Sequence, residues 1–347
     1  MMDDPLIQPP LLDVQGLTTI AARRFEEPTV LVDDIDLRIQ AGERWAIVGE
    51  SGSGKSLTTL SIMRLVDPPL ATRASRCVFE GVELSQLSAE ELRDIRGARM
   101  SLIQQDPLAT LSPVQTVGRQ IAAALRRHHD VTKRSARASA IEMLERVGIP
   151  DPIRRADAHP HHLSGGMRQR VAIALALVCQ PALLFADEPT TALDVTVQAQ
   201  VLDLLVLLSD RSAMSVVLIT HDIGLLPDFA HRVAVMYAGR FVEVGAVGDV
   251  IGGAVHPYTR ALLDAQPGRL PDQPRRRLPA IGGSPPQPGP HWRGCAFAAR
   301  CPAADEQCRA ERPVLRRLAG RDVACHHPVS VSAAASAVPL SALDLNQ

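Results

Sequence analysis

The sequence predicts an α/β fold in which a mostly parallel sheet surrounds a phosphate-binding loop. The first observation is the stretch 49–56, which matches the pattern G-x-x-x-x-G-K-[ST] at every position. The second is its context, because a short apolar run at 44–48 precedes the loop and a helical pattern follows at 57–66. The third is the later alternation of apolar runs with helical segments, which is typical of parallel sheets covered by helices.

The loop residues suit the binding of a nucleotide phosphate. Three glycines carry no Cβ, so backbone N–H groups can close around phosphate oxygens at the start of the following helix. In such loops the lysine reaches the β- and γ-phosphates, and the serine hydroxyl is a ligand of Mg²⁺. We therefore expect a bound nucleotide here. The predicted phosphate-binding residues are Gly49, Glu50, Ser51, Gly52, Ser53, Gly54, Lys55 and Ser56.

Strands are expected on both sides of the loop. The alternating stretches 11–17 and 31–39 predict half-buried strands of an N-terminal antiparallel β-subdomain. After the loop helix, 77–82 predicts a further strand, and a capping box at 88–91 predicts the start of a short helix. The apolar stretch 100–105 then predicts a strand that ends in Gln105-Asp106-Pro107.

The next part of the chain is predicted to be helical. Helical spacing at 116–127 and 133–147 indicates an inserted helical subdomain at about 107–166. Apolar runs at 182–186 and 215–219 then predict buried parallel strands, with a helix between them.

Two short polar stretches border these apolar segments. Ser164 is an expected helix N-cap, and Gly165 and Gly166 after it leave backbone N–H groups open to an anion. Asp187 and Glu188 follow the strand at 182–186, where carboxylates are well placed to bind a cation.

Composition excludes several classes of protein. The chain has 347 residues, 46% of them hydrophobic and 22% charged, which is ordinary for a globular protein. Its formal net charge of −1 lacks the basic excess of a nucleic-acid-binding protein. The longest apolar run, 171–179, is too short to span a membrane, and 1–10 does not resemble a signal peptide. We expect a cytosolic protein that does not bind nucleic acid.

A change of composition after residue 245 predicts a second domain. The chain becomes dense in proline between 267 and 290 and is rich in serine and alanine at its end. We expect a nucleotide-binding domain at 8–254, a C-terminal extension at 255–329 and a disordered tail at 330–347.

Six cysteines are unevenly placed along the chain. Cys77 and Cys179 stand alone in apolar surroundings and are predicted to be core thiols. The other four lie close together near the C-terminus, which in a reducing cytosol favours a metal over disulfides. Their spacings do not match the common C-x-x-C zinc patterns. These four residues are Cys295, Cys301, Cys308 and Cys325.

Several of these stretches, taken in order, resemble ATP-binding-cassette (ABC) ATPases. The series comprises the loop at 49–56, Gln105, the stretch 163–167, the acid pair, the stretch 191–194 and His221. The resemblance covers about 11–245 and implies a P-loop ATPase core. The stretches 256–263 and 294–326 resemble the C-terminal extension of ATPase subunits from oligopeptide and dipeptide importers.

The resemblance implies a role for each residue of the series. Asp187 would hold Mg²⁺ together with Ser56 and Gln105, and Glu188 would act on the attacking water. Gln105 would also contact this water, and His221 would donate to the γ-phosphate. The remaining stretch, Ser164, Gly165 and Gly166, would bind ATP held by the opposite subunit of a dimer.

Adenine recognition departs from the family pattern. Where relatives carry an aromatic residue that stacks on the base, this chain has Thr19-Ile20-Ala21. Phe25 is the alternative on a longer loop.

The resemblance also bears on the four C-terminal cysteines. In some relatives these cysteines hold a [4Fe-4S] cluster, which is the first interpretation here. Structural Zn²⁺ and free thiols remain alternatives, and His326 or His327 could replace one thiolate.

The function implied is that of an ATP-hydrolysing subunit of a peptide importer. Its partners would be two membrane permease subunits, a second homologous ATPase subunit and, indirectly, an extracytoplasmic peptide-binding protein. The two ATPase subunits would form a heterodimer, with a homodimer as the alternative. It would lie peripherally at the cytoplasmic face of the inner membrane. The alternatives are an importer of another cargo, such as nickel or a saccharide, and an ABC ATPase without a transport function.

Overall fold

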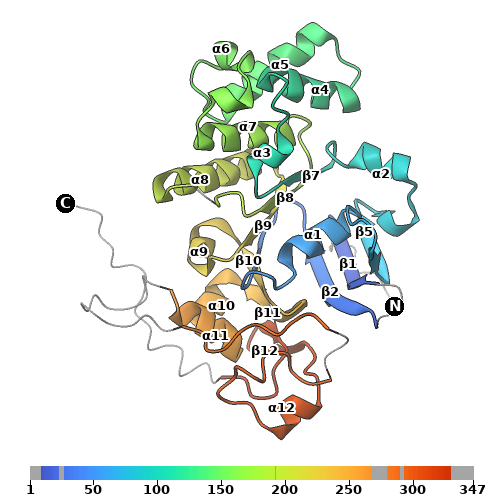
Figure 1. The fold of residues 1–347 in the computed structure, drawn as a ribbon, viewed down its shortest axis with the longest axis vertical. Coiled ribbons are helices and arrows are strands. Elements are labelled where there is room, and N and C mark those ends of the chain that lie inside the picture. Colours follow the sequence, from blue (N-terminus) through green and yellow to red (C-terminus); the bar gives the residue numbers. More distant parts are fainter. Residues whose placement is uncertain (1–8, 23–26, 192, 267–279, 290–292, 330–347) are drawn as a thin grey trace, which may run out of the picture. The chain divides into compact units, whose positions relative to one another are not determined.

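A computed structural model of the chain describes residues 9–22, 27–191, 193–266, 280–289 and 293–329 (Figure 1). These residues form two compact units, between which the chain passes several times. No helix in the described part of the chain has both the length and the hydropathy that crossing a bilayer requires. Among the described residues, the first unit takes in 9–19, 33–46 and 56–220 except 192, and the second takes in 20–22, 27–32, 47–55, 221–266, 280–289 and 293–329.

An antiparallel sheet forms the N-terminal part of the first unit, as the alternating stretches predicted. In β2 (Thr29–Ile39) the residues Ile35, Leu37 and Ile39 are buried and the polar residues between them are exposed. This alternation follows from the period of two along a strand with one covered face. The other strands of this sheet are β1 (Leu12–Ala21), β4 (Leu70–Arg73), β5 (Arg76–Phe79) and β6 (Val82–Glu83).

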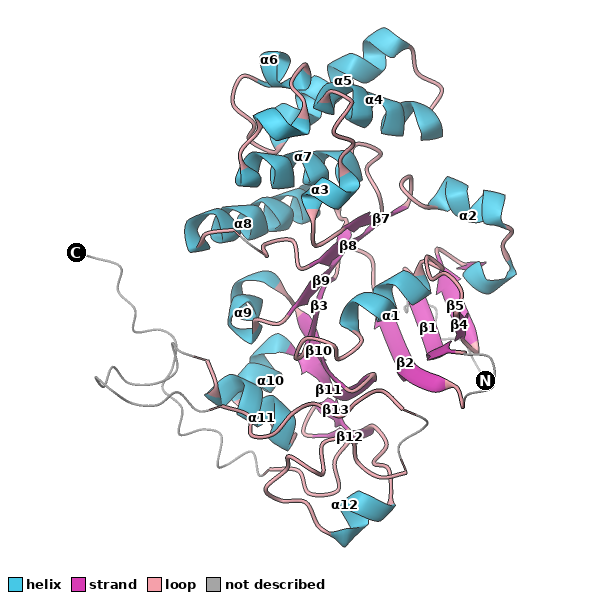
Figure 2. Ribbon diagram, in the orientation of Figure 1, coloured by secondary structure: helices cyan, strands magenta, loops and turns pink. Residues whose placement is uncertain are grey.

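Three parallel strands, β7 (Met100–Ile103), β8 (Leu183–Asp187) and β9 (Ser215–Thr220), form the core of the first unit (Figure 2). They are almost entirely apolar and buried, as expected for parallel strands covered on both faces. Ile103 lies opposite Ala186, and Asp187 lies opposite Ile219. The carboxyl ends of the three strands therefore meet at one edge.

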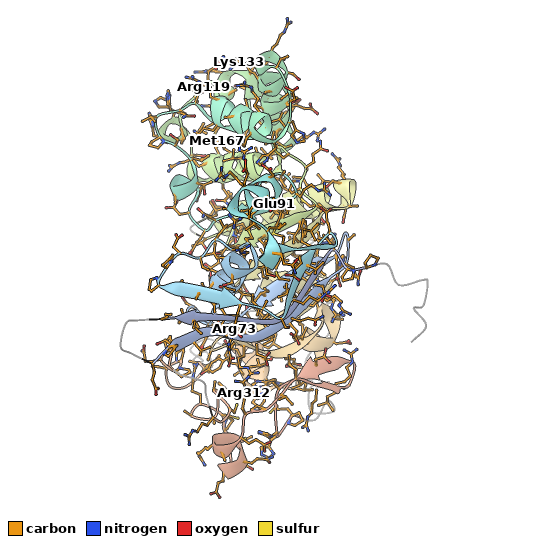
Figure 3. The ribbon with its side chains drawn as sticks, turned by 90° about the vertical axis from the view of Figure 1, so that its right-hand side faces the viewer. Arg73, Glu91, Arg119, Lys133, Met167 and Arg312 are labelled. Carbon is orange, nitrogen blue, oxygen red and sulfur yellow. The ribbon has the colours of Figure 1, made fainter. Side chains whose placement is uncertain are left out.

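Four helices of the first unit pack together (Figure 1). They span residues 117–177, so their bounds are similar to the 107–166 predicted for the helical subdomain. Figure 3 shows Arg119, Lys133 and Met167 on this part of the molecule. Side-chain caps begin two of the helices, because Thr132 accepts from the Ser135 N–H and Ser164 from the Met167 N–H. The helices are α4 (Val117–His128), α5 (Lys133–Arg146), α6 (Pro152–Ala156) and α7 (Gly165–Leu177).

The second unit contains an antiparallel set of strands that includes part of the C-terminal extension. β10 (Arg232–Tyr237) pairs with β11 (Arg240–Ala246), which pairs with β13 (Arg321–Val323), and β13 pairs with β12 (Arg316–Leu318). The predicted irregular cysteine module thus has a regular part, because Glu243 of the earlier strand lies opposite Val323. The helices of this unit are α9 (Leu226–Phe229), α10 (Val247–Gly252), α11 (Pro257–Asp264) and α12 (Glu306–Ala310).

Several predicted elements were too long, among them the strand expected at 100–105, which ends at Ile103. The helix after the phosphate loop ends at Ile62 rather than near 66, because Arg64 has a left-handed φ of 52°. The predicted strand at 77–82 is broken between β5 and β6, where Glu80 and Gly81 have φ values of 48° and 80° and form a turn. The remaining elements are β3 (Arg44–Val48), α1 (Lys55–Ile62), α2 (Ala89–Ile95), α3 (Pro107–Thr110) and α8 (Val195–Ser212).

Two predictions concern residues outside the described part of the chain. The tail at 330–347 is one, and Phe25 as the residue that stacks on adenine is the other.

Candidate nucleotide site and cysteine cluster

Residues 49–55 of the phosphate loop belong to the second unit and allow little room for side chains. A Cβ on Gly49 would lie 2.2 Å from the carbonyl oxygen of Met236, so only glycine fits there. Gly52 and Gly54 have φ values of 78° and 103°, which favour glycine for conformational reasons. The three glycines of the motif are therefore each required by the backbone path.

Polar groups of this loop point inward. Lys55 is 5% exposed, and its Nζ donates to the carbonyl oxygens of Gly49 and Glu50 at 2.8 and 2.9 Å. The Ser53 hydroxyl is buried without a hydrogen-bond partner among the described residues. A buried hydroxyl of this kind is suited to a ligand oxygen, since an unsatisfied polar group is costly. Ser51, by contrast, is exposed.

Ser56, the last residue of the loop motif, belongs to the first unit, and its hydroxyl contacts an acid of that unit. Ser56 is the residue after Lys55, and its Oγ donates to Asp187 Oδ1 at 2.8 Å. Asp187 is the last residue of β8, where the parallel strand ends. A hydroxyl and a carboxylate in contact are the oxygen ligands that Mg²⁺ prefers, so this pair fits the predicted metal site.

Glu188 has a strained backbone and a fixed side chain. Its φ is 44°, an uncommon value for a residue with a Cβ. The Gln105 amide donates to Glu188 Oε2 at 3.0 Å, and the Thr191 hydroxyl donates to the same oxygen at 2.9 Å. The Glu188 N–H donates to the Ile219 carbonyl oxygen at 2.9 Å. The structure thus brings the predicted Gln105 and Glu188 together, and it adds Thr191 as a partner of the carboxylate.

The register of the strands also places the predicted His221. His221 comes directly after β9 and two residues beyond Ile219, which lies opposite Asp187, and its side chain is exposed.

The stretch Ser164, Gly165 and Gly166 lies at the N-terminus of α7, where Ser164 and Gly165 are exposed. A Cβ on Gly165 would meet nothing within 4 Å, whereas one on Gly166 would lie 3.1 Å from the Val197 side chain. This stretch is thus accessible.

Thr19 is not available for a nucleotide base. It is fully buried, and its hydroxyl lies 2.6 Å from Ser61 Oγ and 3.0 Å from Thr72 Oγ1. Its role is therefore in packing of the first unit.

The four C-terminal cysteines line one cavity of the second unit, together with His326 and His327. Burial raises the pKa of the Cys295 thiol, and the neighbouring Cys308 and Cys301 thiols add to this effect. Burial likewise raises the pKa of Cys325, to about 11. Thiols that are buried together need a cation to become thiolates, so their chemistry suits a metal centre. Cys77 and Cys179 lie elsewhere and are buried, as predicted.

A tighter group of ligand atoms lies at one side of this cavity. Ligand atoms of Asp305, Cys308 and His327 are within 4.8 Å of one another. His327 Nε2 lies 2.8 Å from Asp305 Oδ2. The sequence prediction missed Asp305, which also caps α12 by accepting from the Cys308 N–H at 2.9 Å. An acid three residues before a cysteine, at a helix start, was the available signal.

Sequence comparisons agree with this geometry. Residues 32–191 match the family described as "ABC transporter", and residues 242–308 match "Oligopeptide/dipeptide transporter, C-terminal region". The dipeptide transport ATP-binding protein DppD of Escherichia coli is 47% identical over 303 residues, covering 87% of this chain and 92% of that protein. A probable peptide ABC transporter ATP-binding protein of Sinorhizobium fredii, y4tR, is 48% identical over 317 residues, covering 91% and 94%.

A solved structure is similar as well. The ATP-binding cassette MJ0796, determined as a dimer in a post-hydrolysis state with ADP and phosphate, aligns with a TM-score of 0.61. It is 28% identical, and the alignment covers 68% of this chain and 98% of that cassette. The predicted α/β fold of a P-loop ATPase core is thereby confirmed.

Proposed function

Because this chain belongs to the ABC transporter ATPases, and within them to the oligopeptide/dipeptide branch, we propose that it hydrolyses ATP to drive peptide uptake through separate permease subunits. The single observation that carries the peptide assignment is the 47% identity with a dipeptide transport ATP-binding protein over most of both chains. The C-terminal extension supports it, because residues 242–308 match the region that names this branch. In this proposal residues 8–254 form the nucleotide-binding domain and residues 255–329 the extension.

In the proposed reaction Glu188 orients and polarises the water that attacks the γ-phosphorus. One oxygen of the carboxylate accepts from both Gln105 and Thr191, so these residues fix its orientation. Lys55 is placed to exchange its two carbonyl partners for the β- and γ-phosphates. His221, directly after β9, donates to the γ-phosphate.

Ser56 and Asp187 would hold Mg²⁺, with Gln105 as a further ligand. When bound, the ion neutralises phosphate charge.

A complete site in this proposal needs a second ATPase subunit. Ser164, Gly165 and Gly166 would bind the ATP held by that partner, and the partner would supply the same stretch in return. We propose a homologous second subunit, hence a heterodimer, bound to two membrane permease subunits at the cytoplasmic face of the inner membrane. An extracytoplasmic peptide-binding protein would select the cargo.

Two variants test the ATPase assignment. Glu188→Gln should keep ATP binding and lower turnover by about 100-fold or more, because an amide cannot take a proton from water. Lys55→Ala should instead weaken ATP binding, because it removes a phosphate contact. The measurements are ATP hydrolysis by the complex with its permease subunits and nucleotide affinity by fluorescence. Glu145→Gln, an exposed position on α5, is the matched control. Turnover by Glu188→Gln at the parental rate would contradict the assignment.

We propose that Cys295, Cys301, Cys308 and Cys325 bind a [4Fe-4S] cluster. All four cysteines line one cavity of the second unit. Four thiols around one cavity suit a cluster, in which each thiolate binds a different iron. Zinc bound by Asp305, Cys308 and His327 is the alternative that the geometry supports.

Metal analysis of the anaerobically purified chain separates these cases. A cluster predicts about four iron and four sulfide per chain with visible absorbance, lost in Cys325→Ser but kept in Cys77→Ser. The alternative predicts about one zinc without sulfide, lost in His327→Ala. A chain without iron, sulfide or zinc would contradict both proposals.

A further inference from the structure

A residue of the cysteine module forms an ion pair with the phosphate loop inside the second unit. Arg300 Nη1 donates to Glu50 Oε2 at 2.6 Å, and Arg300 Nη2 donates to Glu50 Oε1 at 2.9 Å. Glu50 is the second residue of the loop, 250 positions away in sequence. Two parallel N–H···O bonds of this kind fix the relative orientation of both side chains.

The Arg300 side chain is buried, and its other N–H groups are also engaged. Its exposed fraction is 4%, and that of the Glu50 side chain is 25%. Nε donates to the Gly282 carbonyl oxygen at 2.8 Å, and Nη2 also reaches the Ile281 carbonyl oxygen at 3.3 Å. The guanidinium is therefore held by the extension and presents one defined edge to the loop. Removing one partner of such a pair leaves a poorly solvated charge, so its geometry matters.

A second contact from the extension reaches the same loop residue. The Glu50 backbone N–H donates to the Tyr258 hydroxyl of α11 at 2.9 Å. The Tyr258 ring packs against Tyr237 and Phe297, with centroid distances of 4.6 and 5.3 Å. Both the side chain and the backbone of Glu50 are thus held by residues outside the loop.

The position of Arg300 depends on the cysteine module. It directly precedes Cys301, which lines the thiol cavity, and its N–H donates to the Phe297 carbonyl oxygen at 2.9 Å. Phe297 is 2% exposed and lines the same cavity. Whatever holds Cys301 therefore also fixes the backbone from which the guanidinium extends.

The loop end of this connection leads to the phosphate-binding lysine. Lys55 Nζ donates to the carbonyl oxygens of Gly49 and Glu50, and the extension contacts Glu50. A shift of Glu50 would therefore move one carbonyl partner of Lys55, and the other partner, Gly49, is its neighbour in the chain.

We propose that Arg300 is a positioning residue through which the four-cysteine module sets the conformation of the phosphate loop, so that ATP affinity depends on the state of the module. The inference rests on the proposed role of the loop in ATP binding. It adds that the C-terminal extension, beyond stabilising the fold, controls the nucleotide step.

A double-mutant cycle on the full-length chain tests the ion pair. The Kd of a fluorescent ATP analogue with Mg²⁺ would be measured for the parent chain, Arg300→Met, Glu50→Gln and the double variant. Each single variant should bind at least about fivefold more weakly, and the double variant should lie within about twofold of the weaker single one. Arg309→Met, at an exposed position of α12 in the same module, should bind as the parent does.

Binding by Arg300→Met at parental affinity would overturn the proposal, as would additive effects in the double variant. Lys55→Ala is measured in parallel. If Lys55→Ala and Arg300→Met both bind ATP like the parent, the proposed ATP-binding role of the loop is wrong. If Lys55→Ala binds weakly while Arg300→Met binds like the parent, only the role of Arg300 is wrong.

A second double-mutant cycle tests whether the cysteine module acts on ATP binding through Arg300. Cys301→Ser should weaken ATP binding in the parent background and should change it by less than about twofold when Arg300→Met is already present. Equal effects in both backgrounds would show that the module does not act through Arg300.

Two measurements separate positioning from general damage to the fold. Arg300→Lys keeps the charge but not the paired geometry, so its affinity should lie between those of the parent and Arg300→Met. In the assembled complex, Arg300→Met should raise the KM for ATP by a larger factor than it lowers kcat, because the residue contacts the loop and not Glu188. An equal loss of kcat with unchanged KM would contradict positioning.

Discussion

Gly49 is the loop residue at which a single methyl group meets the firmest obstacle. Its Cβ would lie 2.2 Å from a backbone oxygen, that of Met236, which cannot move as a side chain end can. Gly49→Ala should therefore displace the loop and weaken ATP binding by about tenfold or more, a change of about 1.4 kcal/mol. Fluorescence titration with a nucleotide analogue measures this.

The matched control is Gly248→Ala in α10, where a Cβ would meet nothing within 4 Å. It should leave affinity unchanged and stabilise the fold slightly, because alanine favours helix over glycine. Affinity of Gly49→Ala within about twofold of the parent would show that the loop adapts without cost to phosphate binding.

Elements with strong local signals were predicted well from the sequence. The helices at 116–127 and 133–147 appear as α4 and α5, shifted by about one residue at their ends. The capping box at Ser88 and Glu91 is present with both hydrogen bonds. Their periodicity and capping chemistry are local, so no tertiary contact is needed to read them.

Element ends were predicted less well where single residues reverse the chain. Arg64 and Glu80 have positive φ values although neither is glycine, so neither residue by itself marks the end of α1 or the break after β5. The available signal for the break was Gly81, the second residue of the turn. Apolar residues resume after both positions, with Leu65 and with Val82.

In the candidate site, too, residues marked by local sequence spacing were predictable, and contacts between residues distant in the sequence were not. Residues within the phosphate loop could be predicted because their spacing is itself the signal. The contact between Gln105 and Glu188 joins residues 83 positions apart and depends on the register of β7 and β8. The Arg300–Glu50 pair is not fixed by strand register, since Arg300 lies in a loop with no periodic pattern. Such a contact becomes visible only once the chain is folded.

At the scale of the whole molecule, the proposed catalytic unit is larger than one chain. Ser164 and Gly165 are exposed at the start of α7, and a residue that only capped this helix would not need a flexible glycine after it. An exposed, glycine-containing helix N-terminus is suited to an anion that another subunit brings. ATP turnover should therefore depend on Ser164 only when a second ATPase subunit is present.

Ser164→Ala and Thr132→Ala form a matched pair for this prediction. Each hydroxyl caps a helix of the first unit, accepting from an N–H at 3.3 and 3.1 Å respectively, so each loss should cost about 1 kcal/mol of stability. In the complex with the second ATPase subunit and the permeases, Ser164→Ala should lower turnover by about tenfold or more, and Thr132→Ala should not. ATP affinity of the isolated chain should be unchanged in both, because its own loop is intact. Similar turnover by the two variants would show that Ser164 serves only as a helix cap. Another residue would then have to donate to the ATP held by the second subunit.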